Sequence, residues 1–500
     1  MSNLISSILT SSVYDVAKRT PVDYAKKLSQ KMHTKIYLKR EDLQPIFSFK
    51  IRGAYNKMSS LSEEEREAGV IAVSAGNHAQ GVAYSARKLD ISVVIVMPST
   101  TPAIKVEAVE SYGAEVVLYG DNLSEAAPEC ARLTKESGRT FIHPYDDPLV
   151  IAGQGTVGKE IIEQLPDVTH VFVPVGGGGL IAGISGYIKQ IAPHVVIVGV
   201  EPVDAATLHT SLAKKRRVTL DHVGTFADGV AVRQLGKLSY EIAKQYVDYT
   251  ITVSNDQLCA AIKQIFEETR TIVEPAGALA VAGINQFNSE APFSKNNCVV
   301  AVNSGANMTF ERLQYVTERT LIGSGQEALL SVKLPEKPGA LENFCKALGK
   351  HNISEFNYRQ TSDSEAHILV GVNTANHENA KKVVSQLKSD GYNVSDLTDN
   401  DLAKEHIRHM IGGKQGPSCE ALVHFNFPER PGALADFLET LNQRWNISLF
   451  HYRGMGADNG RVLIGFDVDS KHPAFLEFLK DTDFDYKIET PNTAYSTFLG

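Results

Sequence analysis

The sequence has few of the features that mark secreted, membrane or nucleic-acid-binding proteins. Its five cysteines are scattered through 500 residues without a CxxC pair, which argues against a disulfide framework and against a cysteine-based zinc site. The longest apolar runs, such as 92–97, have the length of a strand and are far shorter than a membrane span. A net charge of −8, with one short basic run at 214–217, argues against nucleic acid as a partner.

The N-terminus lacks a basic segment followed by a long apolar core, so we expect no export signal and no membrane partner. A hydrophobic fraction of 43% and a charged fraction of 22% are typical of globular proteins. A chain of 500 residues is too long for a single ordinary core. We therefore expect a cytoplasmic protein with roughly two to four domains.

Short apolar runs alternate with helical patterns over the first two thirds of the chain. The expected strands are 35–38, 70–73, 92–97, 115–119, 168–175, 195–200, 250–253 and 298–302, and the expected helices are 79–89, 102–111, 180–191, 256–269 and 276–287, after two short helices on either side of Pro21. This alternation is typical of α/β proteins, in which helices cover the faces of parallel sheets. We expect two packed α/β units with a ligand-binding crevice between them.

The last third of the chain repeats itself. Glu-Lys-Pro-Gly-Ala-Leu at 336–341 recurs as Glu-Arg-Pro-Gly-Ala-Leu at 429–434, an offset of 93 (429 − 336). Each copy predicts the order strand, Pro-Gly turn, helix, strand, strand, helix, strand, which is a ferredoxin-like α+β unit. We therefore expect domains at 1–325, 326–400 and 420–500, with a linker at 401–419 that contains glycine and proline.

Lys50 lies between two apolar residues, Phe49 and Ile51. An apolar setting disfavours the ammonium ion, lowers the lysine pKa from about 10.4 and leaves a free amine that can attack a carbonyl carbon. The alternative is a lysine whose aliphatic stem packs while its charged end reaches water.

Four consecutive glycines, Gly176, Gly177, Gly178 and Gly179, follow an apolar strand and precede a predicted helix. Without side chains, successive backbone N–H groups can point at one anion, and the helix N-terminus adds partial positive charge. The segment lacks the Gly-Lys-Ser/Thr ending of a nucleoside triphosphate loop. We interpret it as a phosphate cup, and the alternative is a tight strand-to-helix turn.

Residues 153–158 match the dinucleotide-binding pattern Gly-x-Gly-x-x-Gly by letter. However, Asp146-Asp147-Pro148 precedes the match, where a buried strand is required. We interpret this segment as a helix face of small residues that packs against the sheet.

Polar residues also follow two other predicted strands. Ser74, Ala75, Gly76, Asn77 and His78 end one strand and open a helix, and their donors can bind a carboxylate or a ring oxygen. Ser304 ends a later strand and places one hydroxyl towards the crevice. The alternatives are an N-cap loop with a structural histidine, and a capping serine.

A buried amine, a phosphate cup, a donor-rich loop and a neutral hydroxyl together predict a pocket for pyridoxal 5'-phosphate. Through residues 48–50, 74–78, 176–179 and 304–305, the chain resembles the biosynthetic threonine deaminases of the fold type II pyridoxal-phosphate family. The paired C-terminal repeats resemble the ACT-like regulatory domains of that family.

The resemblance implies a role for each matching residue. Lys50 would form the Schiff base, Asn77 would meet the ring 3'-oxygen, Gly176 to Gly179 would hold the phosphate, Ser304 would face the pyridine nitrogen, and Ser74 to His78 would bind substrate. Gly229 and Glu274 also lie in matching motifs, without an assigned role. No metal is implied.

The resemblance further implies an allosteric homotetramer that deaminates L-threonine to start isoleucine biosynthesis, with L-serine as an additional substrate. Isoleucine and valine are the expected effectors, and Tyr358 and Tyr452, each followed by arginine in matching positions of the two repeats, are the candidate allosteric residues. Threonine synthase, serine racemase and a sulfhydrylase remain enzymatic alternatives of the same fold. A non-catalytic amino-acid sensor is the alternative from another class.

Overall fold

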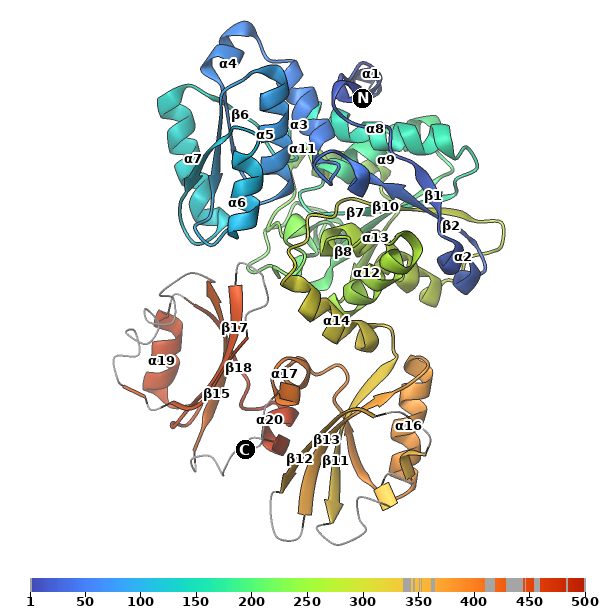
Figure 1. Cartoon of the computed structure of the whole chain (residues 1–500), viewed down its shortest axis with the longest axis vertical. Coiled ribbons are helices and arrows are strands. Elements are labelled where there is room, and N and C mark those ends of the chain that lie inside the picture. The colour runs from blue at the N-terminus through green and yellow to red at the C-terminus, as the bar shows by residue number, and fades with distance from the viewer. Residues whose placement is uncertain are drawn as a thin grey trace. The chain divides into compact units, whose positions relative to one another are not determined.

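The computed structural model describes two compact units, Met1–Phe310 and Glu311–Gly500. Figure 1 shows the chain coloured from N- to C-terminus. The residues described are 2–335, 343–344, 347–349, 351, 353–360, 365–409, 419–428, 444–445, 447–453, 459–482 and 484–498. Within them, no helix is both long enough and apolar enough to cross a membrane.

The first unit contains two sheets, as the alternating pattern predicted. One has the order β1-β2-β10-β7-β8-β9 and is parallel apart from its edge strand β1, and the other has the parallel order β5-β4-β3-β6. The strands are β1 (Val22–Tyr24), β2 (Lys35–Arg40), β3 (Val70–Val73), β4 (Val93–Met97), β5 (Glu115–Leu118), β6 (Thr140–Phe141), β7 (His170–Pro174), β8 (Val196–Pro202), β9 (Tyr249–Val253) and β10 (Cys298–Asn303). The short strands β1 and β6 were not predicted.

Helices cover the faces of both sheets (Figure 1). They are α1 (Ser2–Leu9), α2 (Lys26–Met32), α3 (Lys50–Ser59), α4 (Glu63–Ala68), α5 (Asn77–Leu89), α6 (Ala103–Glu110), α7 (Leu123–Ser137), α8 (Pro148–Gln164), α9 (Gly179–Ile191), α10 (Thr207–Ala213), α11 (Lys237–Tyr246), α12 (Asn255–Thr269) and α13 (Pro275–Glu290). Central strands such as β4 and β10 are buried along their whole length, which is why they read as continuous apolar runs and not as alternating ones.

Helix α8 corrects one interpretation of the sequence. Its N-cap is Asp147, whose Oδ1 accepts hydrogen bonds from the N–H groups of Leu149 and Val150, and Pro148 occupies the first turn. The small-residue face was expected to pack against the sheet, but it packs against two helices. A Cβ at Gly153 would lie 2.8 Å from Gly53 Cα in α3, and a Cβ at Gly155 would lie 3.1 Å from Gly183 O in α9.

The second unit contains two four-stranded antiparallel sheets of matching order, β12-β13-β11-β14 and β16-β17-β15-β18. Their elements are β11 (Glu327–Pro335), β12 (Ile353–Gln360), β13 (Glu365–Asn373), α16 (His377–Ser389), β14 (Asn393–Asp396), β15 (Ala421–Pro428), β16 (Ile447–Arg453), β17 (Asn459–Phe466), α19 (Pro473–Asp481) and β18 (Asp485–Ile488), preceded by α14 (Arg312–Gly323). The predicted ferredoxin-like strand order and second helix of each copy are confirmed. The Pro-Gly turns at 336–341 and 429–434 lie outside the described residues.

Each sheet of the second unit has an apolar core of its own, and a third cluster joins the two copies. This cluster contains Leu329, Leu369, Leu422 and Leu463, from β11, β13, β15 and β17. Helices α17 (Asp401–Glu405) and α20 (Thr493–Phe498) complete it. Residues 401–409, at the start of the predicted linker, are therefore helical and packed.

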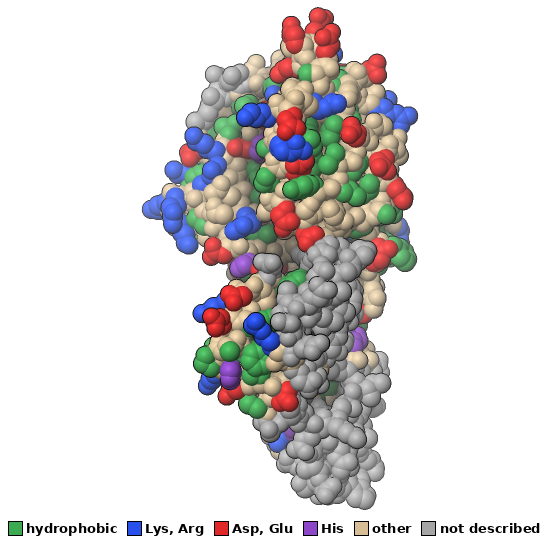
Figure 2. Space-filling view, turned by 90° about the vertical axis from the view of Figure 1, so that its left-hand side faces the viewer, with side chains coloured by type: hydrophobic (Ala, Val, Ile, Leu, Met, Phe, Trp, Pro, Cys, Tyr) green, Lys and Arg blue, Asp and Glu red, His purple; other side chains and the backbone are tan. Residues whose placement is uncertain are grey.

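On the face of the first unit that Figure 2 shows, acidic and basic side chains both lie among apolar ones.

Candidate active site

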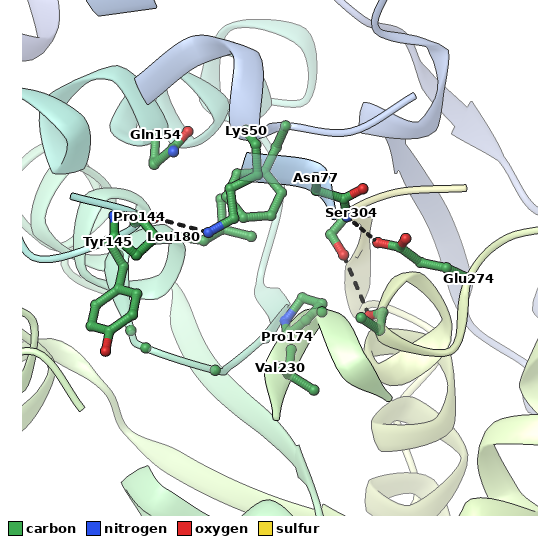
Figure 3. Close-up of a pocket in the computed structure, with 17 residues that line it drawn as sticks. Lys50, Asn77, Pro144, Tyr145, Gln154, Pro174, Leu180, Val230, Glu274 and Ser304 are labelled. Atoms are coloured by element: carbon green, nitrogen blue, oxygen red, sulfur yellow. Dashed lines mark hydrogen bonds between the residues drawn. The ribbon is translucent and has the colours of Figure 1, made fainter. Parts of the chain in front are cut away.

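A cavity in the first unit lies between the two sheets, at the carboxyl ends of several parallel strands. The loops after β3, β6, β7 and β10 bring Asn77, Tyr145, Gly176 and Ser304 to it, and α3 adds Lys50 (Figure 3). The complete lining is Phe49, Lys50, Asn77, Pro144, Tyr145, Gln154, Pro174, Gly176, Gly177, Gly178, Gly179, Leu180, Gly229, Val230, Glu274, Ala276 and Ser304. This is the usual place for a ligand in an open α/β sheet.

Backbone pairing fixes the start of α3 beside the end of β10. Ser48 and Gly305 form an antiparallel bridge, and the N–H of Phe49 donates to the carbonyl oxygen of Ser304 at 3.1 Å. Phe47, just before this pairing, has a φ of 57°, which is uncommon for a residue other than glycine. The pairing therefore holds Lys50, the first residue of α3, next to Ser304.

The Lys50 amine lies inside the cavity wall. Its Nζ donates to the carbonyl oxygen of Pro144 at 2.9 Å and lies 5.3 Å from the centroid of the Phe49 ring. Burial lowers the pKa of Lys50 to about 8, and the nearby carboxylate of Glu274 opposes that shift in part. A lysine with this pKa supplies free amine near neutral pH, which a solvated lysine does not.

The glycine segment turns the chain from β7 into α9. Gly178 has a φ of 91°, and a Cβ at Gly177 would lie 2.2 Å from the ring of Tyr145. A Cβ at Gly176 would lie 2.8 Å from Val230 Cα. These close approaches require glycine, and they keep the backbone at the N-terminus of α9 free of side chains where it meets the cavity.

The side-chain amide of Asn77 donates one hydrogen bond and accepts another. Its Nδ2 donates to Oε1 of Glu274 at 2.6 Å, and its Oδ1 accepts from Nδ2 of Asn307 at 2.6 Å. Asn307 also donates to the carbonyl oxygen of Ile46 at 2.8 Å. The orientation of the Asn77 amide is therefore set by its neighbours, with its NH2 group beside an acid.

Ser304 is buried, and its hydroxyl donates to the carbonyl oxygen of Ala276 at 3.3 Å (Figure 3). The cavity wall thus contains a neutral hydroxyl, and the only carboxylate among its lining residues is that of Glu274.

The loop predicted to bind substrate is only partly in the cavity wall. Asn77 lines it, whereas Ser74, Ala75 and Gly76 lie in the loop before α5 and are not among the lining residues. The His78 ring is buried, and its Nε2 lies 2.8 Å from the carbonyl oxygen of Ile142. Burial lowers the pKa of His78 to about 3, so this histidine is a neutral donor to the backbone.

The two predicted allosteric tyrosines lie in the second unit, on the corresponding strands β12 and β16. In the ladders, Tyr358 pairs with Ile368 and Tyr452 pairs with Val462. Their side chains lie outside the part of the chain that is described.

Three residues near the site were not singled out from the sequence. Tyr145 and Gln154 line the cavity, and Asn307 orients Asn77. Tyr145 follows the two-residue strand β6, which is too short to recognise, and Gln154 lies inside the misleading glycine pattern. A recognised β6 would have pointed to Tyr145, because ligands bind at the carboxyl ends of parallel strands.

Two protein families match the chain. The family described as "Pyridoxal-phosphate dependent enzyme" matches residues 13–305, and "C-terminal regulatory domain of Threonine dehydratase" matches 318–407 and 412–499. The chain is 48% identical over 509 residues to the mitochondrial threonine dehydratase of Saccharomyces cerevisiae, covering 98% of this chain and 88% of that protein. The chain belongs to the threonine dehydratase family of pyridoxal-phosphate-dependent enzymes.

A second relative and two solved structures are also similar to the chain. The biosynthetic L-threonine dehydratase of Haemophilus influenzae is 46% identical, over 100% of this chain and 98% of its own. The processed threonine deaminase isoform 2 of Solanum lycopersicum has a TM-score of 0.63 at 49% identity, over 64% of this chain and 92% of its own. Maize serine racemase has a TM-score of 0.60 at 32% identity, over 63% of this chain and 97% of its own.

The residues present suit the cofactor of this family. Pyridoxal phosphate needs an amine that can be free near neutral pH, and Lys50 has a pKa of about 8. It also needs an anion site, and the glycine turn at the N-terminus of α9 leaves no room for side chains. The amine and the turn line one cavity.

Proposed function

We propose that this protein removes water from L-threonine and releases 2-oxobutanoate and ammonia, the first committed step of isoleucine biosynthesis. The observation that carries the proposal is the single cavity wall that contains Lys50, the glycine turn 176–179 and Ser304, in a chain that also has the regulatory repeats of the family. The regulatory family that matches these repeats is that of threonine dehydratase, which favours this activity over a racemase or a synthase.

Each group has a part in holding the cofactor. Lys50 Nζ would attach its aldehyde carbon, the N–H groups of Gly176 to Gly179 would bind its phosphate, and Asn77 would bind its ring oxygen. Pyridoxal phosphate, when bound, supplies the electron sink that makes the Cα–H bond of an amino acid acidic. The carboxylate of Glu274 fixes Asn77 through the bond at 2.6 Å.

Lys50 would also act as a proton acceptor. Nζ of Lys50 would be the group that accepts the Cα proton of a bound amino acid, because its depressed pKa leaves it partly neutral near pH 7. Its bond to the carbonyl oxygen of Pro144 holds the amine at the cavity wall. Phe49 and Leu180 in the same lining exclude water from it.

Ser304 would select elimination over other outcomes. A hydroxyl does not keep a pyridine nitrogen protonated as a carboxylate does, so the negative charge that develops at Cα is poorly stabilised. Loss of the β-hydroxyl would then be favoured over reprotonation of Cα. L-Serine, which has the same β-hydroxyl, would be a second substrate.

We further propose that the C-terminal repeats bind isoleucine and inhibit the enzyme, that valine competes there, and that the active form is a homotetramer. Tyr358 and Tyr452, at corresponding positions of β12 and β16, are the proposed effector-site residues. A cytoplasmic location also stays a prediction, because the yeast relative is named mitochondrial and plant relatives are named chloroplastic.

One assay tests the proposal. Purified protein with pyridoxal phosphate should form a keto acid and ammonia in equal amounts from L-threonine, and added isoleucine should suppress this. D-Serine formation from L-serine at a rate above keto-acid formation would replace the proposal with a racemase. No turnover of either amino acid, with the cofactor bound, would indicate a sensor.

A further inference from the structure

Three potential metal ligands lie together in the second unit; two are adjacent in the chain and the third lies on a later strand. A carboxylate oxygen of Glu405, one ring nitrogen of His406 and one ring nitrogen of His424 all lie within 4.8 Å of one another. Glu405 ends helix α17, His406 follows it directly, and His424 lies in strand β15. The three come from segments that border the two repeats, so sequence spacing gives no hint of the cluster.

Two members of the cluster are buried, and His424 is half-buried. Glu405 is 3% exposed and His406 is 0% exposed, and the two imidazole rings meet edge to face with centroids 5.3 Å apart. Nε2 of His424 makes no hydrogen bond within the described part of the chain. A buried ring nitrogen without such a partner is costly, and coordination of an ion would satisfy it.

Two arginines, Arg319 and Arg461, form ion pairs with the carboxylate of Glu405.

The same arginines decide which ion could bind. Nη2 of Arg319 lies 2.6 Å from Oε1 of Glu405, and Arg461 binds the same oxygen. Their positive charges oppose any cation, and Asp401, 3.2 Å from Arg319, offsets them only in part. Calcium and magnesium depend on several charged oxygen ligands, whereas imidazole nitrogen suits zinc and its neighbours.

We propose that Glu405, His406 and His424 form a binding site for one zinc-like divalent transition ion between the two regulatory repeats. Two imidazoles and one carboxylate give three protein ligands, and water would complete a tetrahedral set. Because α17 follows the first repeat and β15 begins the second, the ion would join the two copies next to their shared apolar cluster. No metal was predicted from the sequence, because the zinc patterns considered there contain cysteine and this site contains none.

Cobalt(II) and zinc(II) titrations of the full-length, cofactor-loaded protein test the site. After treatment with a chelator, the wild-type chain should bind one Co²⁺, with the intense visible d–d absorption of a tetrahedral site, and Zn²⁺ should displace it. His424→Gln should weaken binding by about 100-fold or more, since loss of an outer-shell partner alone costs about 10–100-fold. His409→Gln is the matched control, because His409 lies three residues from His406 and outside the cluster.

A second readout does not depend on spectra. Zinc should raise the thermal unfolding midpoint of the wild type and of His409→Gln, because a ligand that binds only the folded state stabilises it, and should not raise that of His424→Gln. If His424→Gln fails to fold without metal, His406→Asn replaces it. Absence of Co²⁺ binding by the wild type, or equal binding by the cluster variants, would overturn the proposal.

Discussion

Nδ2 of Asn307 donates a hydrogen bond of 2.6 Å to Oδ1 of Asn77, and this bond decides which way the Asn77 amide faces. With Oδ1 occupied, the NH2 group of Asn77 is directed to Glu274 and the cavity. Asn307 itself is not in the lining, so it acts on the site only through Asn77.

Asn307→Ala should therefore lower activity without touching the cofactor directly. Leaving the buried Oδ1 of Asn77 without its donor costs about 1–3 kcal/mol of free energy. If the transition state is destabilised by this amount, kcat/KM falls by about 5- to 150-fold. We expect the absorption spectrum of the bound cofactor to shift as well, because Asn77 can then rotate. Asn307→Asp should be worse than Ala, since a carboxylate would repel Oδ1. Unchanged kinetics and spectrum in both variants would show that Asn77 needs no support.

Lys50→Ala should fold and should lose turnover completely. The variant lacks the amine, so borohydride should fix no cofactor to the protein, whereas the wild type should be labelled. Near-normal formation of keto acid by Lys50→Ala would contradict the proposed function as a whole.

The stability of the cofactor-free protein should depend on the charge of Lys50. Its pKa is about 8 in the folded chain and about 10.4 when unfolded, so folding is penalised in full below pH 8 and the penalty disappears as pH rises through 8 to about 10.4. Lys50→Met should be more stable than the wild type by about 3 kcal/mol at pH 7, and the difference should vanish near pH 10.5. Denaturant titrations of both chains at several pH values measure it. A difference independent of pH would mean that Lys50 is solvated.

Gly177→Ala should weaken cofactor binding through Tyr145. The added Cβ would lie 2.2 Å from the Tyr145 ring, which must move within the cavity wall. Gly138→Ala is the control: it places a side chain at a φ of 69° with open space around it, and should cost about 1 kcal/mol of stability without changing cofactor affinity. Fluorescence titration with pyridoxal phosphate and thermal unfolding separate the two effects. Equal cofactor affinities in the two variants would place the phosphate elsewhere.

Ser304→Asp should change the products more than the binding of substrate. A carboxylate next to a ring nitrogen raises the pKa of that nitrogen by about 1–3 units, which stabilises charge at Cα and gives time for reprotonation. Racemisation of L-threonine at Cα should rise relative to elimination, measured by chiral chromatography, while Ser304→Ala should keep the wild-type ratio. An unchanged ratio in Ser304→Asp would argue that Ser304 does not face the ring.

Tyr358→Ala and Tyr452→Ala should each raise the isoleucine concentration for half-inhibition by about tenfold and leave uninhibited activity nearly intact, because allosteric coupling is typically about 1–3 kcal/mol. Tyr486→Ala, on β18 of the second copy, is the control and should keep normal inhibition. By reciprocity, threonine should weaken isoleucine binding by the same factor that isoleucine weakens threonine binding. Normal inhibition in both variants would place the effector elsewhere.

The sequence predicted the parts of this site that are local in the chain. Lys50 between two apolar residues and four glycines between a strand and a helix each carry their chemistry in adjacent residues. The Asn307–Asn77 bond and the cluster of Glu405, His406 and His424 were not predictable, because they join segments that only the fold brings together. The packing partner of α8 was predicted wrongly for a related reason. Small residues at that spacing allow a helix to pack closely on a sheet or on another helix, and the pattern does not distinguish the two.

Those glycines have a consequence for how this fold diversifies. Helix α8 meets α3 through Gly53 and Gly153, and meets α9 through Gly155 and Gly183, with backbone almost touching backbone. Helix α3 begins at Lys50 and α9 begins at Gly179, so the separation of amine and anion site is fixed by main-chain contacts that side-chain substitutions barely affect. Mutations in the surrounding loops can then alter which amino acid is accepted, while the positions of the Lys50 amine and the anion site stay the same. We therefore expect loop substitutions to change substrate preference more readily than they change the separation of amine and anion site.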